Sequence, residues 1–280
     1  MSAELVRVSP RWLALREPAD AEARARDLAK QLAHRRPATD RWLIHDLGGG
    51  TGSMGRWLAP LLPGPQDWVV HDRDADLLAL AAEDSPGPAA DGAAVTVATQ
   101  CSDIIGLDPS ALAGATLVTA SALLDMLTAR ELSELVTVCA GPKCPVLLAL
   151  SVTGRVELTP SDPLDRRLTD AFNAHQRRAT DHGALLGPDA AAFAADAFRA
   201  RGAEVVMRDS PWRLGREHAE LTAEWLRGWV GAACDQDRPL SRSADDYARS
   251  RLAQLAAGEL TVTVHHADLL VISPQASSPC

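Results

Sequence analysis

A run of glycines behind a short apolar segment is the strongest chemical signal in this sequence of 280 residues. Residues 44–55 read Ile-His-Asp-Leu-Gly-Gly-Gly-Thr-Gly-Ser-Met-Gly. Glycines where a strand ends let the backbone turn tightly and approach a ligand closely. Two binding patterns overlap in the run. One is G-x-G-x-x-G, formed by Gly50, Gly52 and Gly55, and the other is D-x-G-x-G-x-G, formed by Asp46, Gly48, Gly50 and Gly52.

The acid ahead of the glycines favours the second pattern. In a dinucleotide-binding fold the first turn and the following helix hold a pyrophosphate, which a carboxylate at Asp46 would repel. S-adenosylmethionine carries a sulfonium and an ammonium and no phosphate, so an acid suits it. A nicotinamide-dependent oxidoreductase stays as the less favoured alternative, because Asp72 follows at about the ~20-residue spacing of dinucleotide sites.

The segment Asp46-Leu47-Gly48-Gly49-Gly50-Thr51-Gly52 resembles the first motif of the class I S-adenosylmethionine-dependent methyltransferases. The resemblance extends from about Arg41 to Val152. It implies an α/β fold that is Rossmann-like and doubly wound. The expected sheet is mostly parallel and seven-stranded, with helices on both faces and a helical lid. It also implies S-adenosyl-L-methionine as the cofactor.

Further motifs of that family assign residues to parts of the cofactor. The resemblance implies that Asp72, which ends Val69-Val70-His71-Asp72, bonds the ribose hydroxyls, although an Asp there could also cap the next helix. Asp103, within Gln100–Ile104, matches the acid near adenine. The cofactor-binding residues we expect are Asp46, Gly48, Gly50, Gly52, Asp72, Asp103 and Ser121.

Methyl transfer is an in-line displacement that mainly requires the nucleophile to be held close to the methyl group. A general base is needed only for a protonated or weak nucleophile. Asp125 follows the fourth expected strand and could orient or deprotonate the substrate, or simply cap a turn. His175 is the second catalytic candidate, and Arg177 or Arg178 could hold an anionic group. The alternative for these three is a solvated, salt-bridged helix.

Other polar and aromatic residues are assigned to packing. His45, inside the first strand, is expected to be packed and hydrogen-bonded. Alternation along the last strand should send His265 and His266 to opposite faces, so the pair does not predict a metal site. Trp212, Trp225 and Trp229 could line an aromatic pocket, yet the helical spacing of the last two is typical of a core face.

Composition narrows the classes of function. The net charge of −9 disfavours binding to nucleic acid or to an anionic membrane surface. The scattered cysteines predict no zinc site, and no acidic cluster predicts another metal. The start of the chain lacks a signal-peptide pattern and no apolar run is long enough to span a membrane, so we expect a cytoplasmic protein. After the fourth strand, Ser121-Ala122-Leu123-Leu124 departs from the Asn-Pro-Pro motif of amino-group methylation.

Short β-branched runs alternate with Ala- and Leu-rich segments, which predicts a mostly parallel sheet covered by helices. The strands expected are Trp42–Leu47, Trp68–Asp72, Val95–Ala98, Thr116–Ala120, Pro145–Val152, Ala203–Arg208 and a long, antiparallel Leu260–Ile272 near the edge. The helices expected are Ala19–Arg35, Gly55–Leu62, Ala75–Glu83 and Ala129–Cys139.

We therefore expect one methyltransferase domain over residues 1–280. Its parts are an N-terminal helical cap (1–40), a cofactor-binding core (41–153), a possible lid insertion (154–188), and the remaining sheet and helices (189–280). The predicted function is methyl transfer to an oxygen, nitrogen or carbon nucleophile of a small molecule. A protein of the same fold that binds S-adenosylmethionine without transferring methyl groups is the alternative. The sequence assigns neither the substrate nor the oligomeric state.

Overall fold

The structure is a computed structural model that describes residues 8–35 and 40–273. The strands are β1 (Trp42–Leu47), β2 (Gln66–Asp72), β3 (Val95–Cys101), β4 (Leu117–Ser121), β5 (Val146–Thr159), β6 (Ala179–Thr180), β7 (Gly183–Ala184), β8 (Glu204–Asp209), β9 (Trp212–Leu214) and β10 (Thr261–Ile272). The helices are α1 (Pro10–Ala23), α2 (Arg26–Ala33), α3 (Ser53–Leu58), α4 (Ala75–Glu83), α5 (Ala129–Ala140), α6 (Asp165–Gln176), α7 (Ala190–Arg199), α8 (Ala219–Gln236) and α9 (Ser241–Ala257).

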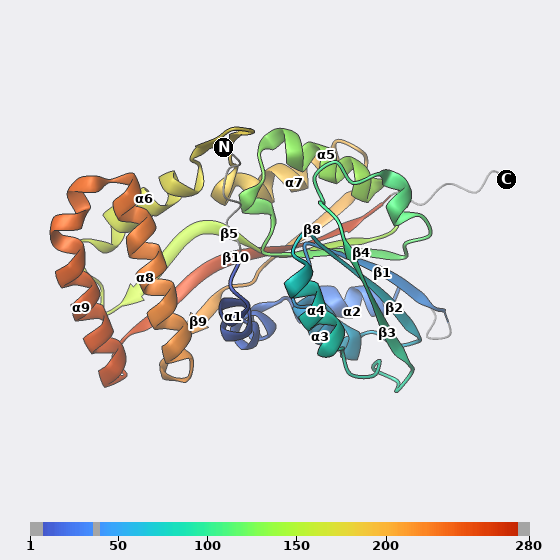
Figure 1. Cartoon of the computed structure of the whole chain (residues 1–280), viewed down its shortest axis with the longest axis horizontal. Coiled ribbons are helices and arrows are strands. Elements are labelled where there is room, and N and C mark those ends of the chain that lie inside the picture. The colour runs from blue at the N-terminus through green and yellow to red at the C-terminus, as the bar shows by residue number, and fades with distance from the viewer. Residues whose placement is uncertain (1–7, 36–39, 274–280) are drawn as a thin grey trace.

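Eight of the described strands form one sheet, in the order β3-β2-β1-β4-β5-β10-β8, with β9 paired to β10 (Figure 1). Strands β1 to β5 are parallel, and β10 runs antiparallel to β5, β8 and β9. The prediction of a doubly wound, mostly parallel sheet is confirmed. The long last strand lies one place in from the edge strand β8.

Alternation along the strands sends apolar side chains to both faces of the sheet. Leu148 packs with α5 and α7 on one face, whereas its neighbour Leu147 packs with α2 and α3 on the other. Figure 1 shows α5 and α7 above the sheet and α2, α3 and α4 below it. Because both faces are covered, the free edge at the carboxyl ends of the strands is where a ligand can reach the sheet.

The order of the strands reverses between β1 and β4. From β1 the chain proceeds outward to β2 and β3, and it then crosses back to β4 and β5 on the other side of β1. The loops that leave β1 and β4 therefore diverge and open a crevice at their carboxyl ends. The glycine run follows β1 and Asp125 follows β4, so the topology brings the two segments together.

β5 and β10 extend well beyond the rest of the sheet. The fifth strand was predicted to end at Val152, and this was wrong because the alternation continues, with Val156 and Leu158 turned inward and Arg155 and Glu157 exposed. Gly154, with φ of +78°, lies within the extended strand. The predicted insertion at 154–188 thus begins as a strand. A third apolar cluster packs α6, α8 and α9 against these strand ends, at the left of Figure 1.

The N-terminal helical segment is broken where one helix was predicted over Ala19–Arg35. α1 ends at Ala23 and α2 begins at Arg26, because the amide of Ala25 turns away to donate to the Asp268 carboxylate at 2.8 Å. The same carboxylate accepts from the Leu150 amide and the Ser210 hydroxyl. The break directs α1 across the crevice between β1 and β4, while α2 packs against the sheet. The rest of the predicted cap, residues 1–7 and 36–39, lies outside the described residues.

Candidate active site

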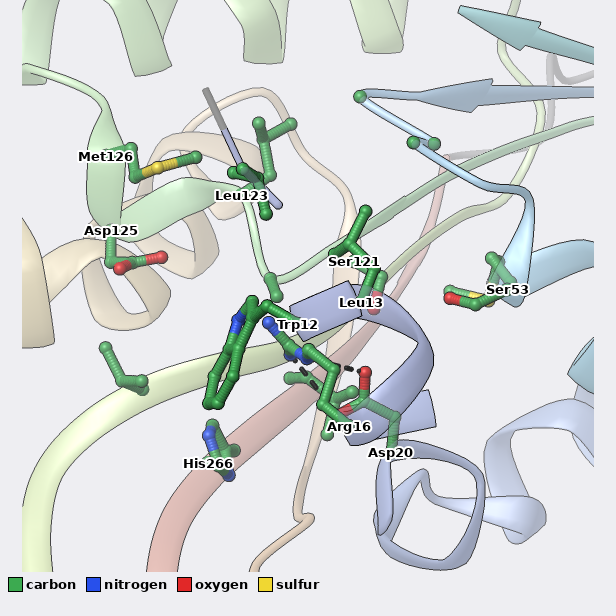
Figure 2. A pocket seen from close by; sticks show the side chains of 18 of the residues that line it. Trp12, Leu13, Arg16, Asp20, Ser53, Ser121, Leu123, Asp125, Met126 and His266 are labelled. Carbon is green, nitrogen blue, oxygen red and sulfur yellow. Dashed lines mark hydrogen bonds and ion pairs between the residues drawn. The ribbon is translucent and has the colours of Figure 1, made fainter. Parts of the chain in front are cut away.

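A cavity of about 650 Å³ fills the crevice at the carboxyl ends of β1, β4 and β5. Its walls come from the glycine run, the ends of β2 and β4, α1, α6, α8, β9 and β10. Figure 2 shows Trp12, Arg16 and Asp20 reaching into it from α1, with Ser53, Ser121 and Asp125 on the sheet side. The structure thus gathers residues that are more than 250 positions apart in the chain.

The glycine run adopts a conformation that other residues would strain. Gly48, Gly50 and Gly52 have φ of +63°, +53° and +82°. A Cβ on Gly49 would lie 2.5 Å from Asp46 Oδ2 and 2.7 Å from Val70 Cγ1. The loop is therefore pressed against β1 and β2, so its backbone forms part of the cavity wall.

Asp46 is fully buried at the end of β1. Its Oδ1 accepts a 2.7 Å hydrogen bond from the Thr119 hydroxyl, while Oδ2 has no partner among the described residues. Burial raises the pKa of Asp46 to about 7, which the Thr119 bond and the charge of Arg24 counter only in part. This carboxyl group borders the cavity with one oxygen left over for a ligand.

Asp72 joins the second strand to the glycine loop. Its Oδ2 accepts from the Gly50 amide and its Oδ1 from the Asp74 amide, both at 2.9 Å. Asp74, not Asp72, caps α4, since its side chain accepts from the Asp76 amide. The helix-cap alternative for Asp72 is therefore wrong. Asp103 also lines the cavity, where its side chain accepts from the Ile105 amide.

Two serines face the cavity with a buried arginine behind them. Arg24 is 2% exposed, and its Nη2 donates to Ser53 Oγ at 3.2 Å and to Ser121 Oγ at 3.1 Å. Its Nη1 donates to the Ser53 carbonyl, its guanidinium lies over the Trp57 ring, and its Nε has no partner among the described residues. Both hydroxyls line the cavity, so a positive charge stands directly behind this part of the wall.

α1 covers the cavity through a network of polar and aromatic contacts. Arg16 donates to both carboxylate oxygens of Asp20, at 2.9 and 3.2 Å, and lies over the Trp212 ring. The Trp212 indole also donates to Asp20, at 2.9 Å. On the neighbouring stripe of the same helix, Leu13 approaches Gly50 and Glu17 pairs with Arg56. α1 thereby bridges the glycine loop and β9.

The two catalytic candidates are not brought together. Asp125 lines the cavity, and burial raises its pKa. His175 is absent from the lining, whereas its α6 neighbours Phe172 and Gln176 contribute to it. Burial, together with the charge of Arg178, lowers the pKa of His175. Arg177, outside the lining as well, forms a salt bridge with Asp189, as expected for a surface ion pair.

His265 and His266 both contribute to the cavity wall, contrary to the expectation that alternation separates them. The pairing of β10 with β5 shifts register between Val264 and His266, and a bulge of this kind re-aims side chains. His266 is 4% exposed and its ring lies 5.2 Å from that of Trp212. Burial lowers the pKa of His266 to about 4.

The remaining expectations about packing hold. His45 is buried, with its Nδ1 2.9 Å from His71 Nε2. Trp225 and Trp229 are stacked and buried, and Trp212 and Trp225 also line the cavity.

Several residues that line or support the cavity were not predicted from the sequence. Among them are Trp12, Arg16, Asp20 and Ser53, which line the cavity, and Arg24, which lies behind Ser53. Ser53 could have been found, because it directly follows the glycine run. The other four lie at or near α1, whose residues show no apolar stripe.

The described part of the chain, residues 8–35 and 40–273, shows no group of three or more His, Cys, Asp or Glu arranged for a metal ion. Within those same ranges, no helix has the length and apolar character to cross a membrane.

No protein-family model matches the sequence, and neither does any curated protein. The fold is similar to that of the YcgJ protein of Bacillus subtilis, at 14% identity and a TM-score of 0.49, over 90% of this chain and 100% of that one. It is also similar to the cyclopropane synthase MmaA2 of Mycobacterium tuberculosis, at 12% and 0.46, over 88% and 82%. A third is a SAM-dependent methyltransferase of Geobacter sulfurreducens in complex with S-adenosyl-L-homocysteine, at 15% and 0.43, over 95% and 99%. At such identities and TM-scores, these likenesses carry no argument about the ligand.

Gly49→Ala should disrupt the glycine loop. The added methyl group would overlap Asp46 and Val70, and overpacking of this kind costs about 1–3 kcal/mol of unfolding free energy. Urea denaturation measures the loss. The control is Gly87→Ala, where a Cβ meets nothing within 4 Å and the unfolding free energy should change by less than about 0.5 kcal/mol. Equal stability of the two variants would contradict the close packing of the loop.

Proposed function

We propose that the protein is a methyltransferase that uses S-adenosylmethionine to methylate a small-molecule nucleophile. The observation that carries the proposal is the pair of acids, Asp46 and Asp72, that border the glycine loop at the cavity. Asp72 occupies the amide of Gly50, a donor that a pyrophosphate would need. Two carboxyl groups at this position would repel the pyrophosphate of a dinucleotide. They suit a cofactor that carries a sulfonium, an ammonium and a ribose.

The amino-acid end of S-adenosylmethionine fits the wall between Asp46 and the two serines. The free Oδ2 of Asp46 would accept from the ammonium. Arg24 donates to the oxygens of Ser53 and Ser121, which leaves each hydroxyl proton free to be donated into the cavity. Two donors backed by a buried positive charge suit a carboxylate. The chain thus offers an acceptor and a pair of donors to a zwitterion.

Residues at or beyond the carboxyl ends of β2 and β3 would contact the other parts of the cofactor. Asp72 would bond the ribose hydroxyls, and Asp103 lies where adenine would extend beyond β3. The backbone of Gly48 and Gly50, which line the cavity, would lie against the methionine and ribose, since no side chains intervene there. Gly52 is outside the lining.

When bound, the cofactor supplies an electrophilic methyl group, whose bond to sulfur breaks with its electron pair staying on sulfur as the bond to the substrate forms. The chain's task is to hold the nucleophile in line and to receive any proton that it loses. Asp125 is our candidate for the proton acceptor. It lines the cavity, and burial raises its pKa, which makes its carboxylate a stronger base. His175, outside the lining, is not assigned this role.

The affinity for S-adenosyl-L-homocysteine should fall as the pH is lowered through the pKa of Asp46. That pKa is about 7 in the free protein, and an ammonium prefers the ionised carboxylate. At one pH unit below the pKa only about a tenth of Asp46 is ionised, so binding should weaken about tenfold relative to its high-pH limit. Calorimetric titration at several pH values from 5.5 to 8.5 measures this.

Two variants separate Asp46 from other titrating groups. Asp46→Asn should bind weakly at all of these pH values and lose the step. Thr119→Val removes the hydrogen bond that lowers the pKa of Asp46, so the midpoint should move to higher pH. A step that persists in Asp46→Asn would show that another group causes it.

Ser53→Ala and Ser121→Ala should each weaken binding of S-adenosyl-L-homocysteine about tenfold, because each loses a hydrogen bond to a charged group. Neither should affect 5′-methylthioadenosine, which lacks the amino-acid end. Ser133→Ala, at a partly exposed serine on α5 outside the cavity lining, is the control and should leave both affinities unchanged. If the two cavity variants weaken both ligands equally, the serines do not bind the carboxylate.

A further inference from the structure

The cavity continues beyond Ser121 into a part walled by aromatic rings. These come from α1 (Trp12), α6 (Phe172), β9 (Trp212), α8 (Trp225) and β10 (His266), and we call them the aromatic compartment. The centroids of Trp12 and Trp212 are 6.4 Å apart in an edge-to-face arrangement. Trp225 is held from behind by Trp229, which stacks on it at 5.2 Å.

β5 and β10 provide aliphatic side chains between the rings. Val152 and Val156 from β5 and Val264 from β10 all line the cavity. Rings that meet edge to face around an aliphatic wall leave flat faces and ring edges for a planar guest. The compartment therefore has the surface chemistry of a site for an aromatic ring.

The charges that border the compartment are paired. Arg16 and Asp20 neutralise each other through two hydrogen bonds, and the Trp212 indole donates to the same carboxylate. Arg155, at the more exposed rim, pairs with Glu157, and His265 lies 3.6 Å from that same acid.

The imidazole among these rings favours its neutral form. Burial lowers the pKa of His266 to about 4, so this imidazole is uncharged at neutral pH. A charged guest would lose its hydration without gaining an unpaired opposite charge from the described wall, which is costly.

From these contacts we propose that the compartment binds an uncharged small molecule with a planar aromatic ring, held beside the methyl donor. The inference rests on the proposed function, since it makes this molecule the acceptor of the methyl group. The chemistry of the walls restricts the proposed substrate to uncharged molecules with an aromatic ring. Amines that are protonated at neutral pH and carboxylates lie outside that class.

Three naphthalene probes with one ring system and different charges test this. The protein is first saturated with S-adenosyl-L-homocysteine and then titrated calorimetrically at pH 7.5. The probes are 2-naphthol (neutral), 2-naphthoate (anionic) and 2-(aminomethyl)naphthalene (cationic). We expect 2-naphthol to bind at least about tenfold more tightly than either charged probe, because only the charged probes bury an unpaired charge.

A charge change in the wall provides the sharper comparison. Asp20→Asn keeps an oxygen that can accept from Trp212 but leaves Arg16 uncompensated, so the affinity for 2-naphthoate relative to 2-naphthol should rise about tenfold. Glu17→Gln is the matched control. It removes one negative charge from the same helix at a residue that pairs with Arg56 outside the lining, and should leave the ratio unchanged. Thermal unfolding verifies that both variants are folded.

The outcomes separate the two proposals. If S-adenosyl-L-homocysteine itself does not bind, the proposed function fails. If it binds and a charged probe matches or exceeds 2-naphthol, or no probe binds, the inference about the substrate is wrong while the cofactor site stands. An unchanged ratio in folded Asp20→Asn would also overturn it.

Discussion

The arrangement of the cavity depends on one buried carboxylate, that of Asp268. It accepts hydrogen bonds from the amides of Ala25 and Leu150 and from the Ser210 hydroxyl, and so joins the break between α1 and α2 to β5 and to the end of β8. α1 buries only Ala19 and Asp20, so apolar packing alone does not determine its position. Polar contacts at its two ends and along its length hold it over the cavity. Buried groups of this kind require all their partners, which ties the lid of the cavity to the integrity of the sheet.

Electrostatics divides the cavity into two unlike halves. Around the glycine loop, Asp46 with its unpartnered oxygen and the buried charge of Arg24 behind the two serines can complement a zwitterionic ligand. In the aromatic compartment, by contrast, Arg16 and Asp20 compensate each other and His266 is neutral. A charged cofactor and an uncharged acceptor can thus lie in one cavity without competing for the same wall. Ser121, at the end of β4, stands between the halves.

Local signals in the sequence predicted the elements and residues that surround the glycine loop. β1 and α4 have the predicted bounds, because an apolar run and a capping aspartate are contained within a few residues. Of the predicted cofactor residues, all but Gly52 reached the cavity wall, since parallel strands deliver their carboxyl ends to one edge. The contacts of these residues with a cofactor stay a prediction.

The aromatic compartment could not be predicted from such local signals. Its walls come from α1, α6, α8, β9 and β10, which meet only through tertiary packing. α1 has no apolar stripe from which its position could be predicted, and nothing in the sequence marks Ala25 as the residue whose amide would leave the helix to bond Asp268. The prediction that His265 and His266 face opposite sides failed at the bulge between Val264 and His266, because one extra residue in a strand re-aims the side chains beyond it. His175 belonged to the right helix, but the lining is formed by its neighbours.

The most direct test of the account is calorimetric titration of the whole protein with S-adenosyl-L-homocysteine, with NADH titrated in parallel. The two ligands share an adenosine, so they differ in the feature on which the account depends, a zwitterionic amino acid instead of a pyrophosphate. The account predicts saturable binding of S-adenosyl-L-homocysteine at one site per chain and no binding of NADH. Binding of NADH without S-adenosyl-L-homocysteine would contradict it, and the glycine loop would then be a phosphate site.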